Sequence, residues 1–215
     1  RCEALREAIS RFEQVNMEEI LCGNGAAELF FAAVQAVWPQ KALVIAPSFS
    51  EYEEALRSVG AEVEYYYLCE EDNFQIREDY VDKLSEEIDM IFLCNPNNPT
   101  GQTIDRDMLI KILDRCKKQN IVVILDECFL EFLDEPNRYE MSDLRGEYPN
   151  LLIIKAFTKI FSMPGLRLGY AISSNQDILE EMSWKLQQWN VSVPAQMAGV
   201  AALEKPKEYI RQTRE

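Results

Sequence analysis

The chain has 215 residues, of which 47% are apolar and 27% charged, enough for one large domain with a buried core. The 37 acidic residues outnumber the 22 basic ones and give a net charge of −15, so no basic face can dominate binding to nucleic acid or an anionic membrane. The chain has no histidine, which excludes Ser-His-Asp triads, Cys-His nucleophiles and His-ligated zinc. Any chemistry must rest on Lys, carboxylates, Tyr, Cys or a bound cofactor, and we predict no metal site and no nucleic-acid partner.

The six cysteines are far apart in the sequence and form no C-x-x-C pair. Three of them interrupt apolar runs, where a thiol acts as a small hydrophobic side chain, so we predict reduced, buried cysteines. The longest apolar stretches, such as residues 121–125, are too short to cross a bilayer, and the N-terminus has neither a signal sequence nor a methionine. These features predict a cytoplasmic protein with no membrane partner, and a chain that begins within a longer protein.

Strand and helix signals alternate along the whole chain. Short runs rich in Val, Ile and Leu indicate buried strands, and the segments between them carry apolar residues at helical spacing. This alternation predicts an α/β fold: one three-layer α/β/α domain with helices on both faces of a mostly parallel, seven-stranded sheet. The predicted strands are residues 19–22, 42–46, 61–67, 90–94, 121–125, 151–154 and 168–172. The predicted helices are residues 4–13, 26–37, 50–59, 77–86, 105–119, 177–189 and 194–203. Ligands bind outside the carboxyl ends of the strands in such sheets, and every unusual loop of this chain lies at such an end.

The first of these loops contains Gly23-Asn24-Gly25 and precedes a predicted helix. Glycines let the backbone approach a ligand closely, and unpaired amides of Gly25, Ala26 and Ala27 at a helix N-terminus would form an anion site. The spacing matches neither G-x-G-x-x-G nor the P-loop pattern, so a plain tight turn explains this motif equally well.

Two further loops place polar groups directly after apolar strands. The segment Asn95-Pro-Asn-Asn-Pro-Thr-Gly101 has two X-Pro bonds, which predict a rigid, bent loop. It is either a turn alone or a loop that holds the Asn98 amide toward a ligand oxygen. Asp126 follows the strand at 121–125, where desolvation raises the pKa of a carboxyl group unless a cation lies opposite. Asp126 is explained either as a helix cap or as a carboxylate that faces a protonated ring nitrogen.

The loop after residues 151–154 contains Thr158, Lys159 and Arg167. A single lysine is usually solvated, but here its neighbours are apolar and a Pro-Gly turn brings Arg167 back toward Lys159. A desolvated lysine beside a second cation is a nucleophile for carbonyl groups, which is Schiff-base chemistry. Phe49 follows another strand, and its ring either packs in the core or stacks on a planar ligand.

In combination, these motifs resemble the large, cofactor-binding domain of the fold type I pyridoxal-phosphate enzymes, in the class I/II aminotransferase group. The resemblance covers essentially the whole chain, residues 1–215. Its most specific parts are residues 95–101, Asp126-Glu127, and Thr158-Lys159 with residues 165–169. Two further stretches are similar to histidinol-phosphate aminotransferases and threonine-phosphate decarboxylases, namely residues 23–28 and 164–170.

The resemblance implies a pyridoxal 5′-phosphate cofactor and a role for each matching residue. Lys159 would form the Schiff base and later move the proton, and Asp126 would keep the pyridine nitrogen protonated, so that the ring accepts electrons. Asn98 would donate to the ring O3′, and Phe49 would stack on the ring. The phosphate would be received by Gly25, Ala26, Ala27, Thr158 and Arg167, through charge-assisted hydrogen bonds.

Two positions depart from the family pattern. The tyrosine that aminotransferases usually place three residues after the aspartate is Phe129 here, which would leave Asn98 as the sole O3′ donor and resembles the threonine-phosphate decarboxylases. The hydroxyl residue often found three positions before the lysine is Ala156, which puts one phosphate contact in doubt. Family members also carry an N-terminal arm and a C-terminal small domain with an arginine for the substrate carboxylate. We therefore expect a large-domain fragment that binds cofactor but turns over poorly.

These features predict a pyridoxal-phosphate-dependent aminotransferase, which moves an amino group between a small amino acid or phosphorylated amino compound and a keto acid. The alternative on the same scaffold is the decarboxylation of a phosphorylated amino acid such as threonine phosphate. A cofactor-binding sensor domain without turnover, and an α/β domain without cofactor, stay open. By resemblance alone, we expect a homodimer in the full-length form.

Overall fold

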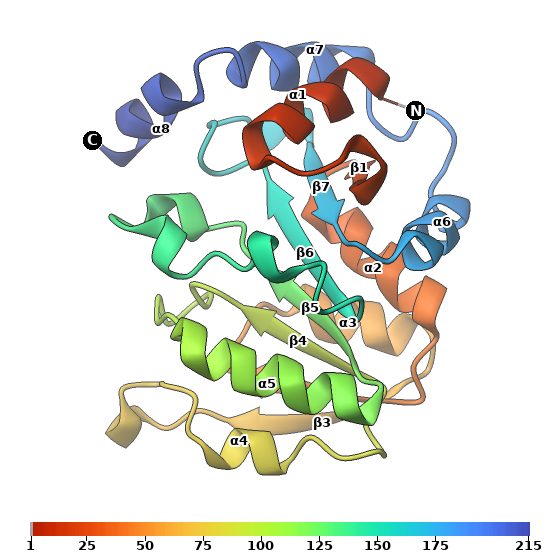
Figure 1. The fold of residues 1–215 in the computed structure, drawn as a ribbon, viewed down its shortest axis with the longest axis vertical. Coiled ribbons are helices and arrows are strands. Elements are labelled where there is room, and N and C mark those ends of the chain that lie inside the picture. Colours follow the sequence, from red (N-terminus) through yellow and green to blue (C-terminus); the bar gives the residue numbers. More distant parts are fainter. Residues whose placement is uncertain (1) are drawn as a thin grey trace.

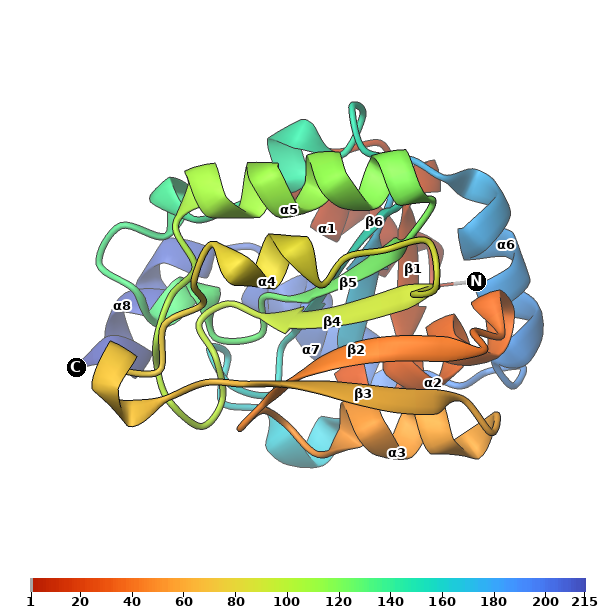
Figure 2. The same ribbon diagram turned by 90° about the horizontal axis from the view of Figure 1, so that it is seen from below.

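The structure, a computed structural model, describes residues 2–215, which form three layers (Figures 1 and 2). One seven-stranded sheet lies in the middle and helices cover both of its faces, which confirms the predicted fold class. The strands are β1 (Ile20–Gly23), β2 (Lys41–Ala46), β3 (Glu62–Tyr67), β4 (Met90–Cys94), β5 (Val122–Asp126), β6 (Leu151–Ala156) and β7 (Gly169–Ile172). The α-helices are α1 (Glu3–Glu13), α2 (Ala26–Val37), α3 (Glu51–Ser58), α4 (Asp79–Asp82), α5 (Arg106–Gln119), α6 (Gln176–Lys185), α7 (Val193–Ala202) and α8 (Pro206–Arg214).

The strand order is β1-β7-β6-β5-β4-β2-β3, so the first and the last strand of the sequence lie side by side at one end of the sheet. Strands β2 to β6 are parallel, whereas β7 is antiparallel to both β6 and β1. The connection from β6 to β7 contains no crossover α-helix. Without such a crossover the chain returns in the opposite direction, which makes neighbouring strands antiparallel. Two reversals restore the direction, so β1 points the same way as β6. Its last residue, Gly23, therefore lies at the same edge of the sheet as Ala156, the last residue of β6.

Each face of the sheet has its own apolar core, because successive residues of a strand point to opposite faces. Phe92 and Ile124 pack under α2, α3 and α6, and Leu93 and Leu125 pack on the other side with α1, α5 and α7. Figure 2 shows α4 and α5 above the sheet and α2 and α3 below it. Two consecutive residues at a strand end thus enter different layers of the molecule.

The helix predicted at residues 77–86 is much shorter in the structure, where only α4 is helical. The N–H groups of Lys83 and Leu84 donate to the carbonyls of Tyr80 and Val81, three residues earlier. Such bonds tighten the backbone into turns, and the segment does not continue as an α-helix.

Two predictions near the C-terminus are also wrong. The helix predicted at residues 177–189 ends at Lys185, because Leu186 takes an extended conformation and is buried in the core. Helix α8 was not predicted, although Pro206 in its first turn is a common helix-start signal.

Four of the six cysteines are buried, as predicted for thiols within apolar runs: Cys22, Cys94, Cys116 and Cys128. Within residues 2–215, no helix combines the length and the apolar character that crossing a bilayer would require.

Phe92 is the centre of the aromatic packing between β4 and the helices on that face. Its ring stacks on Tyr52 with centroids 4.8 Å apart and meets Phe30 edge-on at 6.1 Å. We expect Phe92→Ala to lower the free energy of unfolding by about 3–5 kcal/mol, because the removed ring leaves a cavity. Urea denaturation followed by circular dichroism measures this loss. The control, Tyr67→Ala, removes an exposed ring on edge strand β3 and should cost about 0.5 kcal/mol. Equal losses would contradict this account of the core.

Candidate active site

One cavity of about 180 Å³ at the carboxyl edge of the sheet contains eight of the nine residues that the sequence predicts as cofactor-binding. The eight residues are Ala26, Ala27, Phe49, Asn98, Asp126, Thr158, Lys159 and Arg167. The ninth, Gly25, is the residue directly before α2. Phe30, Cys128, Phe129 and Ala156 complete the lining.

The topology explains why residues so far apart in sequence meet here. The loops after β2, β4, β5 and β6 leave the sheet at one edge because these strands are parallel. The N-terminus of α2 joins them because β1 runs in the same direction as β6. The four loops and the N-terminus of α2 therefore meet at one place, although they are far apart in the sequence.

Asp126 is the buried polar group of this cavity. The Tyr52 hydroxyl donates to its Oδ2 at 2.6 Å, and the Cys128 N–H donates to its Oδ1 at 2.9 Å. Burial raises the pKa of Asp126, whereas the hydrogen bonds from Cys128 and Tyr52, and to a smaller extent the charge of Lys159, act against that rise. A cationic group placed against this carboxyl would favour its ionised form.

Tyr52 is a site residue that the sequence analysis did not single out. It lies in the first turn of α3, is fully buried, and its ring meets Phe49 edge-on at a centroid distance of 5.7 Å. Burial raises the pKa of Tyr52 well above the usual value, so its hydroxyl keeps its proton and remains a donor to Asp126. The only sequence signal was its spacing, three residues after Phe49 on a predicted helix.

The loop after β4 is held by its own asparagines, as expected for a rigid loop. The buried Asn95 side chain accepts from the Ile104 N–H at 2.9 Å. Asn97 donates through Nδ2 to the Pro47 carbonyl and to the Thr100 hydroxyl, each at 3.0 Å. These contacts leave Asn98 half-buried at the cavity, where its amide can meet a ligand.

The N-terminus of α2 lies at the other side of the cavity, but not every predicted amide is unpaired. Gly25 has a φ of 86°, and its N–H donates to the Gly23 carbonyl at 2.9 Å, so the prediction of an unpaired Gly25 amide is wrong. The amides of Ala26 and Ala27 belong to the first helical turn, whose N–H groups have no partner within the helix. Gly25 matters instead through its missing side chain, because a Cβ there would lie 2.8 Å from Arg167 Nη2.

Lys159 lies at the cavity but is exposed, so the expected desolvation is not found in residues 2–215. Its apolar neighbours, Ile160 and Phe161, are buried in the core and turn the lysine outward. The Lys159 ammonium is 5.6 Å from the centroid of the Phe129 ring. Arg167 is exposed as well, and its Nη1 donates to the Pro164 carbonyl at 3.3 Å.

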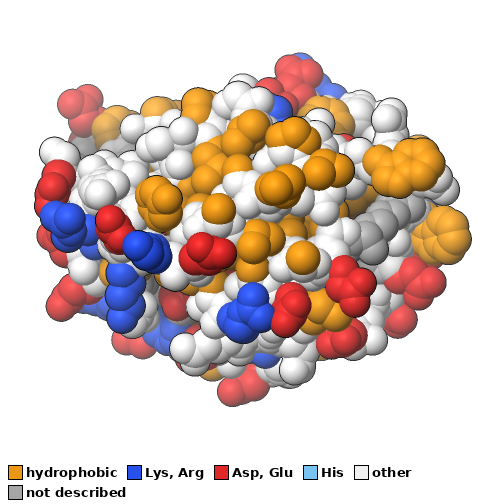
Figure 3. Space-filling view, turned by 90° about the horizontal axis from the view of Figure 1, so that it is seen from above, with side chains coloured by type: hydrophobic (Ala, Val, Ile, Leu, Met, Phe, Trp, Pro, Cys, Tyr) orange, Lys and Arg blue, Asp and Glu red, His pale blue; other side chains and the backbone are white. Residues whose placement is uncertain are grey.

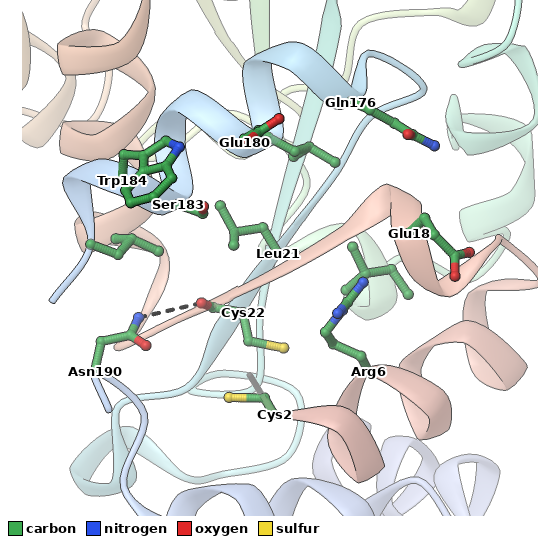
Figure 4. A pocket seen from close by; sticks show the side chains of 13 residues that line it. Cys2, Arg6, Glu18, Leu21, Cys22, Gln176, Glu180, Ser183, Trp184 and Asn190 are labelled. Carbon is green, nitrogen blue, oxygen red and sulfur yellow. Dashed lines mark hydrogen bonds between the residues drawn. The ribbon is translucent and has the colours of Figure 1, made fainter. Parts of the chain in front are cut away.

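The lining suits a flat, phosphorylated aromatic ligand with a carbonyl group. A buried carboxyl, a neutral amide, an aromatic ring and a primary amine converge on the cavity with Arg167, Thr158 and first-turn amides, which are groups that bind phosphate. A second hollow of about 430 Å³ lies beside edge strand β1 and contains Cys2, Cys22, Arg6 and Trp184 (Figure 4). Its lining has no lysine, so it cannot form a Schiff base.

Comparison with known proteins gives the family. The model of the class I and II aminotransferases matches residues 2–215. The chain belongs to this family, whose cofactor is pyridoxal 5′-phosphate.

Curated relatives carry two different names. The chain is 36% identical to a threonine-phosphate decarboxylase of Salmonella typhimurium, over 93% of this chain and 54% of that protein. It is 37% identical to a histidinol-phosphate aminotransferase of Desulfitobacterium hafniense, over 99% of this chain and 59% of that protein. The chain thus spans somewhat more than half the length of these relatives.

Solved structures give the same pair of names. The histidinol-phosphate aminotransferase from Clostridium acetobutylicum superposes with a TM-score of 0.90 at 32% identity, covering 99% of this chain and 62% of that one. The L-threonine-O-3-phosphate decarboxylase from Porphyromonas gingivalis gives a TM-score of 0.86 at 27% identity, covering 98% and 62%. These likenesses agree with the predicted resemblance to both groups.

The hydrogen bond from Tyr52 to Asp126 can be tested by Tyr52→Phe, which removes the donor and keeps the ring. We expect the pKa of Asp126 to rise further and pyridoxal phosphate to bind about 10-fold more weakly, because a hydrogen bond to a charged group contributes about 1.5–3 kcal/mol. Spectrophotometric titration with the cofactor measures the affinity. The control is Tyr80→Phe, which removes a buried hydroxyl that has no hydrogen-bond partner in the part of the chain that the structure describes. Equal affinities for the two variants would argue against a role for Tyr52.

Proposed function

We propose that this chain forms the cofactor-binding part of a pyridoxal-phosphate-dependent aminotransferase. Its substrates are an amino acid or a phosphorylated amino compound and a keto acid. The observation that carries the proposal is the meeting of Asp126, Asn98, Lys159 and the α2 N-terminus at one cavity. The bound cofactor supplies an electron sink for the carbanion at the substrate Cα.

Each residue has a task that follows from its position. Lys159 Nζ, exposed at the cavity, would hold the cofactor through a covalent link and would move a proton at the substrate Cα. Asp126, held by Tyr52, supplies a negative charge in a buried place, where it favours a protonated ring nitrogen. Asn98 would donate to the ring oxygen of the cofactor, and Phe49 would cover its ring. Arg167, Thr158 and the first turn of α2 would hold the phosphate, with Gly25 leaving the space open.

Reduction with borohydride after addition of pyridoxal phosphate tests the role of Lys159. We expect a visible absorbance band from the bound cofactor and, after reduction, a stable label on the peptide that contains Lys159, found by mass spectrometry. Lys159→Ala should lose both signals. The matched control, Lys118→Ala, changes an exposed lysine of α5 and should keep both. Equal labelling of the Lys159→Ala variant, or a label on another lysine alone, would contradict the proposal.

A second candidate is the decarboxylation of a phosphorylated amino acid on the same scaffold. It is favoured by Phe129, which lines the cavity without the hydroxyl that aminotransferases usually offer at this position. The names of two relatives, at 36% and 39% identity, support it as well. The bond that breaks is the one held perpendicular to the cofactor ring, so the groups that anchor the substrate decide between the two reactions.

Product analysis with the purified full-length protein separates the candidates. We expect a keto acid from the amino donor, with the amino group recovered on the acceptor. An amino alcohol phosphate with release of carbon dioxide from threonine phosphate would instead establish the decarboxylase. Cofactor binding without either product would favour the sensor domain.

Three broader expectations stay predictions: a large domain at residues 1–215 within a longer chain, a homodimer and a cytoplasmic location. An apolar surface supports the dimer. Figure 3 shows hydrophobic side chains gathered on the face that carries α1 and α7. Val193 and Met197 of α7 are 66% and 68% exposed, and Trp189 is 88% exposed. Clustered apolar surface of this kind marks an interaction site more often than a solvated face.

A further inference from the structure

A second group of charged side chains lies at the same edge of the sheet as the cavity, but on the opposite face. Lys155 of β6 has its Nζ 2.9 Å from Glu13 Oε2 of α1, 3.1 Å from Glu140 Oε1 and 3.6 Å from Glu127 Oε2. The side chains of Lys155, Glu13 and Glu127 are at most 5% exposed. We call these four residues the Lys155 cluster.

Most polar atoms of the Lys155 cluster have a hydrogen-bond partner, and its three carboxyl groups surround one shared cation. The Tyr170 hydroxyl, on the strand residue paired with Lys155, donates to Glu13 Oε1. The Met141 N–H donates to Glu127 Oε1 at 3.3 Å. Glu127 Oε2 is buried and has no hydrogen-bond partner in the described part of the chain, so its stabilisation comes from the charge of Lys155.

Three carboxyl groups face one ammonium, and their charges are balanced in part by protonation. Burial, opposed by Lys155 and reinforced by Glu140 and Glu13, raises the pKa of Glu127 to about 8. Glu127 therefore holds a proton near neutral pH. Each carboxyl in turn raises the pKa of Lys155, which stays charged despite its burial.

The Lys155 cluster and the candidate active site both use residues at the ends of β5 and β6. Asp126 faces the cavity, and the next residue, Glu127, enters the cluster. Lys155 belongs to the cluster, and the next residue, Ala156, lines the cavity. The Glu127 N–H also donates to the Ile154 carbonyl at 2.9 Å. The Glu127–Lys155 pair thus joins the same two strand ends that carry Asp126 and lead to Lys159.

We propose that Lys155 is a positioning residue for the cofactor site. Through Glu127 on one side and Glu13 on the other, it holds the ends of β5 and β6 against α1. It thereby sets where Lys159 stands relative to Asp126. This inference rests on the proposed function, in which these two residues must meet opposite parts of one small ligand.

Stability alone does not account for such a cluster. Apolar residues of similar volume usually give a core that is equally or more stable than a buried ion pair, because desolvating charges is costly. The ion pairs and hydrogen bonds of the cluster depend on direction, so they fix one arrangement of the strand ends, which apolar packing does not do. The site needs this, because Lys159 and Arg167 are exposed residues of the loop between β6 and β7, residues 157–168.

Cofactor titration of three variants tests the proposal. Lys155→Met removes the charge at similar length, Lys155→Arg keeps it, and Ile153→Ala opens a cavity on the same face of β6 without touching the cluster. We expect Lys155→Met to bind pyridoxal phosphate at least about 10-fold more weakly, because misplacing a site group by about 1 Å costs up to about 100-fold. We also expect it to shift the pH midpoint of the bound cofactor's visible band. Lys155→Arg should keep both the cofactor affinity and the pH midpoint near the wild-type values.

Ile153→Ala separates positioning from stability. It should lower the melting temperature and leave the pH midpoint of the bound cofactor unchanged. A folded Lys155→Met protein with wild-type affinity and midpoint would overturn the inference. An equal shift of the midpoint in Ile153→Ala would overturn it too, since loss of stability would then explain both.

A matched pair of glutamates decides the case if Lys155→Met does not fold. Glu127→Met and Glu140→Met each remove one polar contact with Lys155, but only Glu127 is next to a site residue in the chain. We expect Glu127→Met to weaken cofactor binding and to shift the midpoint, and Glu140→Met to do neither. Equal effects of the two would overturn the inference. If the wild-type protein takes no borohydride label on Lys159, the proposed function is overturned and this inference with it. If the wild type is labelled there, the proposed function stands, and the variants test the inference separately.

Discussion

The structure depends on one constraint, which is that four neighbouring parallel strands, β2, β4, β5 and β6, are buried on both faces. Backbone groups inside such a sheet are paired and its side chains are apolar, so polar chemistry is possible only where the strands end. Because the strands are parallel, these ends lie at one edge. The reversal at β7 adds a fifth segment, since it returns β1 and the N-terminus of α2 to that edge.

The two sides of this edge carry different polar groups because neighbouring residues face opposite layers. Asp126 and Ala156 contribute to the cavity under α2, and Glu127 and Lys155 contribute to the ion cluster under α1. Both groups sit on the same two strand ends, so a change in one side is transmitted to the other through very few bonds. Asp126, a buried carboxyl without an ion-pair partner among residues 2–215, and Lys155, a buried lysine with three carboxyls, are therefore parts of one structural unit.

Local patterns were enough to identify most of the cavity. Asp126 ends β5, and Asn98 and Lys159 lie in the loops that follow β4 and β6. The rule that ligands bind at the carboxyl ends of strands brings the three residues together without coordinates. The pairing of Tyr52 with Asp126 could not be predicted in this way, because the two residues are 74 positions apart and meet only when α3 packs on the sheet. The exposure of Lys159 was mispredicted for the same kind of reason, since its apolar neighbours Ile160 and Phe161 turn to the core.

The sequence by itself determined the fold class, the family resemblance and most of the residues that meet at the cavity, because these depend on periodicity and on short motifs that local interactions maintain. Only the tertiary structure decided which backbone amides are free at α2, where β7 reverses, and which charged groups are buried together. Glu13 and Lys155 are 142 residues apart, and no local pattern encodes their contact. Such a pair exists because packing removes both groups from water at one place, which is a property of the whole fold.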